Sequence, residues 1–169
     1  MGSPEMRKGG VDDLPAILGM LDGAVAWLVS EGRTGQWGSR PWSTHPEAVE
    51  QVRRILAEGT PWIAEIDGEP AGTMTLTGRP GPEVAPAGEP ELYVHSLVTD
   101  RRFARRGVGG ALLAHAVDEA RRHGVSLLRL DCYAGGDGRL VAYYEGNGFT
   151  PTETFTVGDW PGQVLARRV

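Results

Sequence analysis

The chain has 169 residues, a length that fits one domain with a proper core, and we expect a single domain over residues 1–169. Its 17 basic and 22 acidic residues give a formal net charge of -5, which argues against a nucleic-acid-binding domain, and no run approaches the ~18 apolar residues of a membrane span. The one cysteine, Cys132, cannot form an internal disulfide, so we expect a cytoplasmic protein. From the charge and the absence of a long apolar run, we expect neither nucleic-acid nor membrane partners.

Apolar residues at helical spacing predict a first helix that begins at Asp12 and Asp13 and ends near Gly32. A polar loop follows the helix and carries Trp37 and Trp42.

The next segments predict a second helix and a β-hairpin. Ser43 or Thr44 is expected to cap the helix, with Pro46 in its first turn. The β-prone segments "PWIAEI" and "PAGTMTL" flank Asp67 and Gly68, a dipeptide that tolerates the positive φ of a tight turn. A surface loop rich in proline and glycine follows the hairpin.

The second half of the chain alternates strands and helices. "ELYVHSLVT" is a strand, the loop 101–106 leads into a helix that stops at Gly124, and "SLLRLDCY" is a buried strand. "RLVAYYEGN" is a short helix, and two closing strands end the chain. Strand, helix and strand after Glu91 imply a right-handed crossover between parallel strands, so we expect a mixed sheet with helices packed on it.

The stretch "RRFARRGVGGALL", residues 101–113, has the pattern of an anion site. Free N–H groups at a helix start favour negative charge, and Gly107, Gly109 and Gly110 let the backbone approach a phosphate closely. Neither the Rossmann pattern nor a P-loop lysine is present. On this stretch alone, a capped helix with solvated arginines is an equally good interpretation.

The same stretch resembles the coenzyme A loop of the GCN5-related N-acetyltransferases (the GNAT superfamily). Their signature Q/R-x-x-G-x-G/A falls on Ala104 to Gly109, where both glycines match and Ala104 replaces the leading Gln or Arg. "HSLVT" and "LLRLDCYAGGDGRLVAYYEGNGF" are also similar to the family's central strand and to its later strand and helix. The resemblance implies an α/β (α+β) fold, with a mixed, mostly antiparallel central sheet, a splayed parallel strand pair and about four flanking helices.

The resemblance also implies an activity, an acetyl-CoA-dependent N-acetyltransferase. The acetyl group would pass to a primary amine of a small molecule by direct attack in a ternary complex, with acetyl-CoA as cosubstrate and no metal. Two alternatives stay open, a non-catalytic CoA-binding regulatory module on the same fold and a protein or peptide N-acetyltransferase. A homodimer through the closing strands is also left open.

Coenzyme contacts follow from the same resemblance. The pantetheine arm would bind the backbone edge of the central strand, and the pyrophosphate would sit on N–H groups of the glycine loop. The implied contacts are Leu97, Val98, Thr99, Arg105, Arg106, Gly107, Val108, Gly109, Gly110 and Ala111. Asp137 stands where many members carry an asparagine that contacts the coenzyme.

For catalysis, the resemblance points to Tyr144 as the acid that protonates the departing thiolate and as a further coenzyme contact. The alternative for Tyr144 is a packing residue of its helix. His95 has the intrinsic pKa of a base, acting directly or through water, or is a histidine satisfied by local hydrogen bonds. Glu91 and Tyr93 alternate with His95 on one strand face and, with Trp37 of the polar loop, are candidate substrate contacts.

Overall fold

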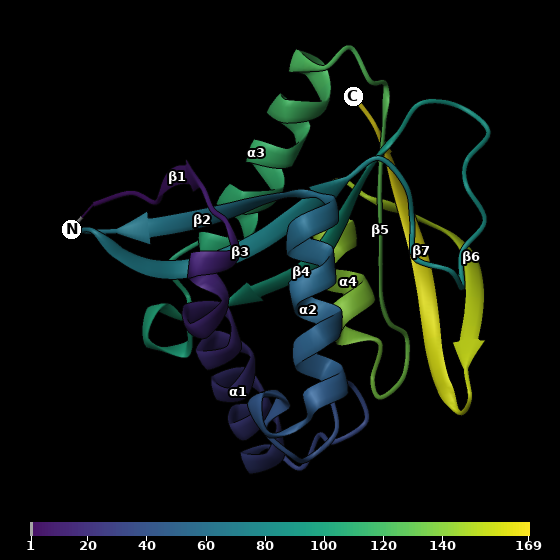
Figure 1. The fold of residues 1–169 in the computed structure, drawn as a ribbon. Helices are drawn as coiled ribbons and strands as arrows, with labels where there is room; N and C mark the ends of the chain where they lie inside the picture. Colours follow the sequence, from purple (N-terminus) through teal and green to yellow (C-terminus); the bar gives the residue numbers. More distant parts are fainter. Residues whose placement is uncertain (1) are drawn as a thin grey trace.

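The computed structural model describes residues 2–169, and the element order along the chain is the expected one (Figure 1). The elements are β1 (Glu5–Lys8), α1 (Leu14–Ser30), α2 (Pro46–Glu58), β2 (Thr60–Ile66), β3 (Glu69–Thr77), β4 (Leu92–Thr99), α3 (Val108–Arg122), β5 (Leu127–Tyr133), α4 (Arg139–Gly146), β6 (Thr150–Val157) and β7 (Trp160–Arg168).

Over residues 2–169, these seven strands form one sheet in the order β1-β2-β3-β4-β5-β7-β6. Neighbouring strands run antiparallel except β4 and β5, which are parallel. The parallel pair is held by the register Leu92 to Leu128 through Val94 to Leu130, after which the two strands diverge. The expected mixed sheet with a splayed parallel pair is therefore confirmed.

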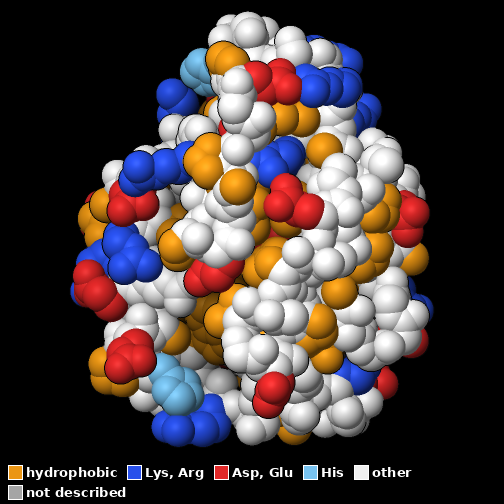
Figure 2. Space-filling view, turned by 90° about the vertical axis from the view of Figure 1, so that its right-hand side faces the viewer, with side chains coloured by type: hydrophobic (Ala, Val, Ile, Leu, Met, Phe, Trp, Pro, Cys, Tyr) orange, Lys and Arg blue, Asp and Glu red, His pale blue; other side chains and the backbone are white. Residues whose placement is uncertain are grey.

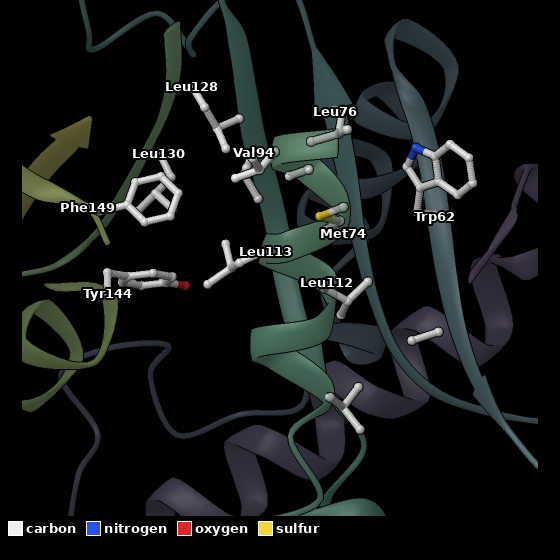
Figure 3. Packing of buried hydrophobic residues seen from close by; sticks show 14 of the residues in the cluster. Trp62, Met74, Leu76, Val94, Leu112, Leu113, Leu128, Leu130, Tyr144 and Phe149 are labelled. Atoms are coloured by element: carbon white, nitrogen blue, oxygen red, sulfur yellow. The ribbon is translucent and has the colours of Figure 1, made fainter. Parts of the chain in front are cut away.

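Helices cover both faces of the sheet, with α1 and α2 in front and α3 and α4 behind in Figure 1. In front, Ile17 and Leu21 of α1 pack with Ile63 of β2. Behind, Leu113 of α3 lies near Leu128 and Leu130 of β5 and Tyr144 of α4 (Figure 3). Each buried aliphatic side chain contributes about 2 kcal/mol by leaving water, so the two clusters hold the helices against the strands.

Helix α1 is apolar enough to invite a second interpretation that the sequence patterns did not raise. By length and composition the segment Val11–Ser30 could cross a membrane. In this structure its buried side chains, including Leu14 and Leu28, pack in the core of the domain. The helix acts here as a core helix.

Two local expectations have different outcomes. Asp67 and Gly68 adopt φ values of 50° and 80°, which confirms the hairpin turn between β2 and β3. The expected cap of α2 is wrong, because His45 occupies the N-cap position. Ser43 instead donates its backbone N–H to Asp22 Oδ1 at 3.1 Å, and with Thr44 it belongs to a short 3-10 turn.

Candidate active site

A cleft of about 1020 Å³ opens where β4 and β5 diverge. The divergence has a cause in the register of the other neighbour of β4. Thr73 of β3 pairs with Val98, but Thr75 pairs with His95, so β4 carries one extra residue in a bulge. Ser96 takes a φ of 55° there, and such a bulge bends the strand away from its partner.

The splay leaves backbone polar groups of β4 open to the cleft. His95, Leu97, Val98 and Thr99 line it, and within residues 2–169 no strand pairs with this edge beyond Val94. Unpaired N–H and C=O groups require partners, and an extended amide-containing ligand can supply them in the manner of an added strand. The three residues expected to bind the pantetheine arm thus lie at an open edge.

The start of α3 forms the second polar wall of the cleft. Gly107 is the N-cap residue with φ 73°, and Arg105 before it has φ 63°. Ala111 makes the first helical hydrogen bond, to Gly107 O at 3.0 Å, and the N–H groups of residues 105–110 donate to no acceptor within the described chain. Free N–H groups and the helix dipole make this helix start suited to an anion.

The expected cradle residues divide between the cleft and its border. Arg105, Gly107, Val108 and Gly109 line the cleft, whereas Arg106, Gly110 and Ala111 do not. The guanidinium of Arg106 lies 5.6 Å from the centroid of the Phe103 ring, on a buried side chain. Gly110 and Ala111 contribute to the site only through the first turn of α3.

Gly109 is the position at which a side chain has no room. A Cβ built there would meet the hydroxyl of Tyr143, which leans from α4 over the start of α3 and lines the cleft. Tyr143 was not anticipated as a cleft residue. Its only sequence signal is its place beside Tyr144 in "AYYEGNGF".

Tyr144 is buried, and Figure 3 shows its hydroxyl directed from α4 toward α3 and Leu113. The residue lines the cleft. Burial raises the pKa of Tyr144, so the phenol keeps its proton near neutrality. Cys132, also on the cleft wall, shows what these surroundings do to sulfur: burial raises the pKa of its thiol to about 12.

His95 lines the cleft, and its ring nitrogen Nε2 is hydrogen-bonded. Its Nε2 lies 2.9 Å from Thr77 Oγ1 and 3.2 Å from the carbonyl oxygen of Arg79. Since the Thr77 hydroxyl donates to that same carbonyl at 2.6 Å, Nε2 must carry the proton and Nδ1 is the free acceptor. Burial lowers the pKa of His95, which favours this uncharged form.

Asp131 is a cleft residue that the sequence reasoning missed. Its Oδ2 accepts a hydrogen bond of 2.6 Å from the Tyr93 hydroxyl. Burial, with a smaller contribution from the charge of Glu83, raises the pKa of Asp131, while the Tyr93 hydrogen bond opposes the shift. A carboxylate inside the apolar strand "LLRLDCY" was the available signal.

Three expected contacts lie away from the cleft. Tyr93 is fully buried and reaches the site only through Asp131. Both carboxylate oxygens of Glu91 accept from Arg129, at 2.7 and 2.9 Å, so Glu91 is held in a buried ion pair. Asp137 is exposed and accepts from the backbone and side chain of Arg139, both at 3.0 Å.

Aromatic residues form the wall of the cleft opposite the helix start. Trp37 and Trp42 lie with ring centroids 6.1 Å apart, and both line the cleft. Trp160 at the start of β7 donates from Nε1 to Gln36 O at 2.9 Å, which joins the β6–β7 hairpin to the polar loop after α1. Figure 2 views the molecule from the β6 and β7 side and shows apolar side chains in its recesses, with acidic side chains beside them.

The described residues 2–169 bring no group of three His, Cys, Asp or Glu side chains into an arrangement that could hold a metal ion. The groups that line the cleft are backbone donors, the phenols of Tyr133, Tyr143 and Tyr144, the His95 imidazole, the carboxylates of Glu83 and Asp131, and four arginines.

Known proteins share this arrangement of elements. The acetyltransferase (GNAT) family model matches residues 25–149. The uncharacterized N-acetyltransferase YesJ of Bacillus subtilis (strain 168) is 25% identical over 146 residues, which is 82% of this chain and 77% of that protein. A GNAT family acetyltransferase from Listeria monocytogenes superposes with a TM-score of 0.72 at 21% identity, covering 98% of this chain and 95% of that one. The PaiA N-acetyltransferase of Thermoplasma acidophilum, solved in complex with coenzyme A, gives 0.70 at 18% identity, covering 99% and 100%.

Proposed function

The chain belongs to the acetyltransferase (GNAT) family, and we propose that it transfers the acetyl group of acetyl-CoA to the primary amine of a small molecule. The observation that carries the proposal is the junction of two features on one cleft. An unpaired edge of β4 and the free N–H groups at the start of α3 together match a ligand with an amide-containing arm and a pyrophosphate.

The residues on the cleft fit such a ligand. Leu97, Val98 and Thr99 would bind the pantetheine amides through their main chain, and the loop from Arg105 to Gly109 would cradle the pyrophosphate. At Gly109 the Tyr143 hydroxyl fills the space that a Cβ would take, so a side chain there would disturb the edge of the cradle. The Thermoplasma acidophilum PaiA N-acetyltransferase, which shares this fold, was solved in complex with coenzyme A, which supports this class of ligand.

Bound acetyl-CoA supplies an activated acetyl thioester, and the protein's own task is to manage protons around it. Tyr144 would donate its hydroxyl proton to the sulfur that leaves. A thiolate in this cavity is costly, since the neighbouring Cys132 has its thiol pKa raised to about 12, so a proton held nearby lowers the barrier to departure.

The proton of the attacking amine must go to a base on the same side of the cleft. Asp131, held by Tyr93, would bind the incoming ammonium and accept the proton. Its raised pKa brings the carboxylate closer to the range in which a base works at neutral pH. His95, neutral with Nδ1 free, is the second candidate and can act through a water.

A contact between two walls of the cleft favours a small acceptor. The hydrogen bond between Trp160 Nε1 and Gln36 O connects the β6–β7 hairpin to the loop after α1, and both segments line the cleft. A folded protein acceptor would need an open groove between these two walls. This contact therefore favours a small amine over a protein side chain.

Calorimetric titration with acetyl-CoA and thiol release with a panel of primary amines test the proposal together. We expect acetyl-CoA to bind, and thiol release to depend on both protein and amine. Tight acetyl-CoA binding with no amine-dependent thiol release would instead identify a non-catalytic CoA-binding module. No binding at all would contradict both interpretations of the cleft.

A further inference from the structure

Resting on the proposed function, we infer that the acceptor is a primary amine that carries an aromatic group and no carboxylate. The cleft lining differs from place to place in charge and side-chain type. Arg105 borders the start of α3, whereas Asp131 and Glu83 are acidic and Tyr133, Phe155 and Trp160 are aromatic. An anionic coenzyme and a cationic aromatic amine match this division.

The aromatic wall is continuous through contacts between three segments. Trp160 lies between Tyr133 and Phe155, with ring centroids 5.7 and 6.1 Å away. Tyr133 in turn packs against the loop after α1, because a Cβ at Gly35 would meet its hydroxyl. The same loop carries Trp37, so flat apolar surfaces surround the acceptor end. Such surfaces favour a ring or another large apolar group over a polar chain.

The charged side chains at this end are acidic. Asp131 lines the cleft where β4 and β5 separate, and Glu83 is near enough for its charge to act on Asp131. Burial lowers the pKa of His95 beside them, which favours its uncharged form. An ammonium group is attracted to this position, whereas a carboxylate on the same carbon as the amine would be repelled and left unpaired.

Four arginines line the cleft, and three of them contact neighbouring side chains. Arg101 stacks on the Trp27 ring with its guanidinium 3.8 Å from the centroid, and Arg33 faces the same ring at 5.8 Å. Arg139 pairs with Asp137 at 3.0 Å, and Arg105 belongs to the loop before α3. Arg101, Arg105 and Arg139 lie outside the segments that carry the aromatic wall, whereas Arg33 belongs to the loop after α1 and faces Trp27.

Asp131 and Tyr144 can accept and donate the protons that acetyl transfer requires. The amine enters as an ammonium ion and gives one proton to Asp131 or, through it, to solvent. Its nitrogen then forms a bond with the acetyl carbon as the carbon–sulfur bond breaks and the electron pair goes to sulfur. Sulfur takes the Tyr144 proton, and the second nitrogen proton passes to the base and restores Tyr144 through solvent. The products are an N-(arylalkyl)acetamide, the free thiol of coenzyme A and one proton released to solvent.

Pairs of amines that differ by one group test the inference. Phenethylamine is compared with phenylalanine and tryptamine with tryptophan, which isolates the carboxylate, and phenethylamine with butylamine, which isolates the ring. We expect kcat/KM for each amine to exceed that of its amino acid by at least about 30-fold, the scale of a buried unpaired charge. Phenethylamine should exceed butylamine by about tenfold, as expected for loss of one aromatic contact surface.

Two variants that each remove one negative charge test whether the acidic side chains of the cleft set the preference for amines without a carboxylate. Glu83→Gln should narrow the discrimination between phenethylamine and phenylalanine by about threefold to tenfold, because it removes one repelling charge. Asp118→Asn removes the same charge from the exposed face of α3, outside the cleft, and should leave the discrimination as it is. An equal effect of both variants would show that net charge, not the site, sets the preference, and would overturn this assignment.

Calorimetry of the same amines with the protein and coenzyme A, where no acetyl group can react, separates the two proposals. Selective binding of phenethylamine without turnover keeps the acceptor inference and overturns acetyl transfer. Turnover that is equal for amines and amino acids keeps acetyl transfer and overturns the inference. If the protein neither binds nor acetylates any of these amines, both proposals are overturned.

Discussion

At the scale of single residues, the chemistry of the cleft depends on how burial treats acids and bases. The Tyr144 hydroxyl and the Cys132 thiol both have raised pKa values because the cavity excludes water. A phenol and a thiol that share such a cavity exchange a proton without moving charge into or out of water. Burial raises the pKa of both groups in the same direction, so what favours transfer from Tyr144 to a leaving thiolate is the positioning of the two groups in one cavity.

Tyr144→Phe should lower kcat by about 10²- to 10³-fold, the usual range for loss of a general acid. The ring and its packing stay, so the dissociation constant of acetyl-CoA should change less than about threefold. Steady-state kinetics and calorimetry measure the two effects. Tyr143→Phe is the comparison, because its hydroxyl lies against Gly109, and we expect that variant to change coenzyme affinity more than kcat. Unchanged turnover in Tyr144→Phe would contradict the acid role.

At the scale of elements, the start of α3 is the part of the site most open to a backbone test. Gly109→Ala should weaken acetyl-CoA binding by at least about tenfold, since the added methyl group would crowd the loop whose backbone N–H groups are proposed to bind the pyrophosphate. Alanine in a helix is more favourable than glycine by about 1 kcal/mol, so a loss of affinity would not come from a weaker helix. Calorimetry gives the affinity, and thermal unfolding checks the fold.

The Cβ at this position would also meet Tyr143, and a double variant separates the two effects. Tyr143→Phe removes the hydroxyl that the new methyl group would touch. If the weak binding of Gly109→Ala persists in the double variant, the phosphate needs the free backbone. Recovery of wild-type affinity would mean that only the Tyr143 contact was disturbed.

Local patterns in the sequence were enough to predict the elements. Periodicity located α1 and α3, and the Asp67–Gly68 turn fixed the hairpin, because these signals depend on neighbours in the chain. The cap of α2 was mispredicted since Ser43 is bound by Asp22, a residue of another helix. That contact depends on tertiary packing, which no local pattern records.

In the site, too, residues in local motifs were predicted and residues placed by tertiary contacts were not. The glycine loop and Tyr144 lie in motifs with a fixed spacing, and the structure brings both to one cleft. Asp131 and Trp160 were missed, because their roles come from partners 38 and 124 residues away in sequence, Tyr93 and Gln36. Alternation alone placed Glu91 with His95, but it could not reveal that Arg129 holds Glu91 away from the cleft.

At the scale of the whole molecule, the cleft depends on the stability of its closed end, where β4 and β5 are still paired. Glu91 before β4 and Arg129 of β5 form that closure, and both side chains are buried. Arg129 also donates to Ala85 O at 2.9 Å, and Ala87 N donates to Glu91 Oε2 at 2.9 Å. The ion pair therefore anchors the loop between β3 and β4, which brings Glu83 to the cleft.

Arg129→Met should lower the free energy of unfolding by about 3–5 kcal/mol, because it leaves the Glu91 carboxylate buried without a partner. The double variant Arg129→Met, Glu91→Leu removes both charges and should recover most of that loss, so the coupling between the two positions is large. Urea unfolding of the wild type, both single variants and the double variant gives this coupling as a thermodynamic cycle. Glu153→Gln is the control, since Glu153 is exposed and approaches Arg129 only at 3.5 Å, and we expect a change below about 0.5 kcal/mol. A double variant as unstable as Arg129→Met would mean that the packing of the arginine, rather than its charge, stabilises the paired end of β4 and β5.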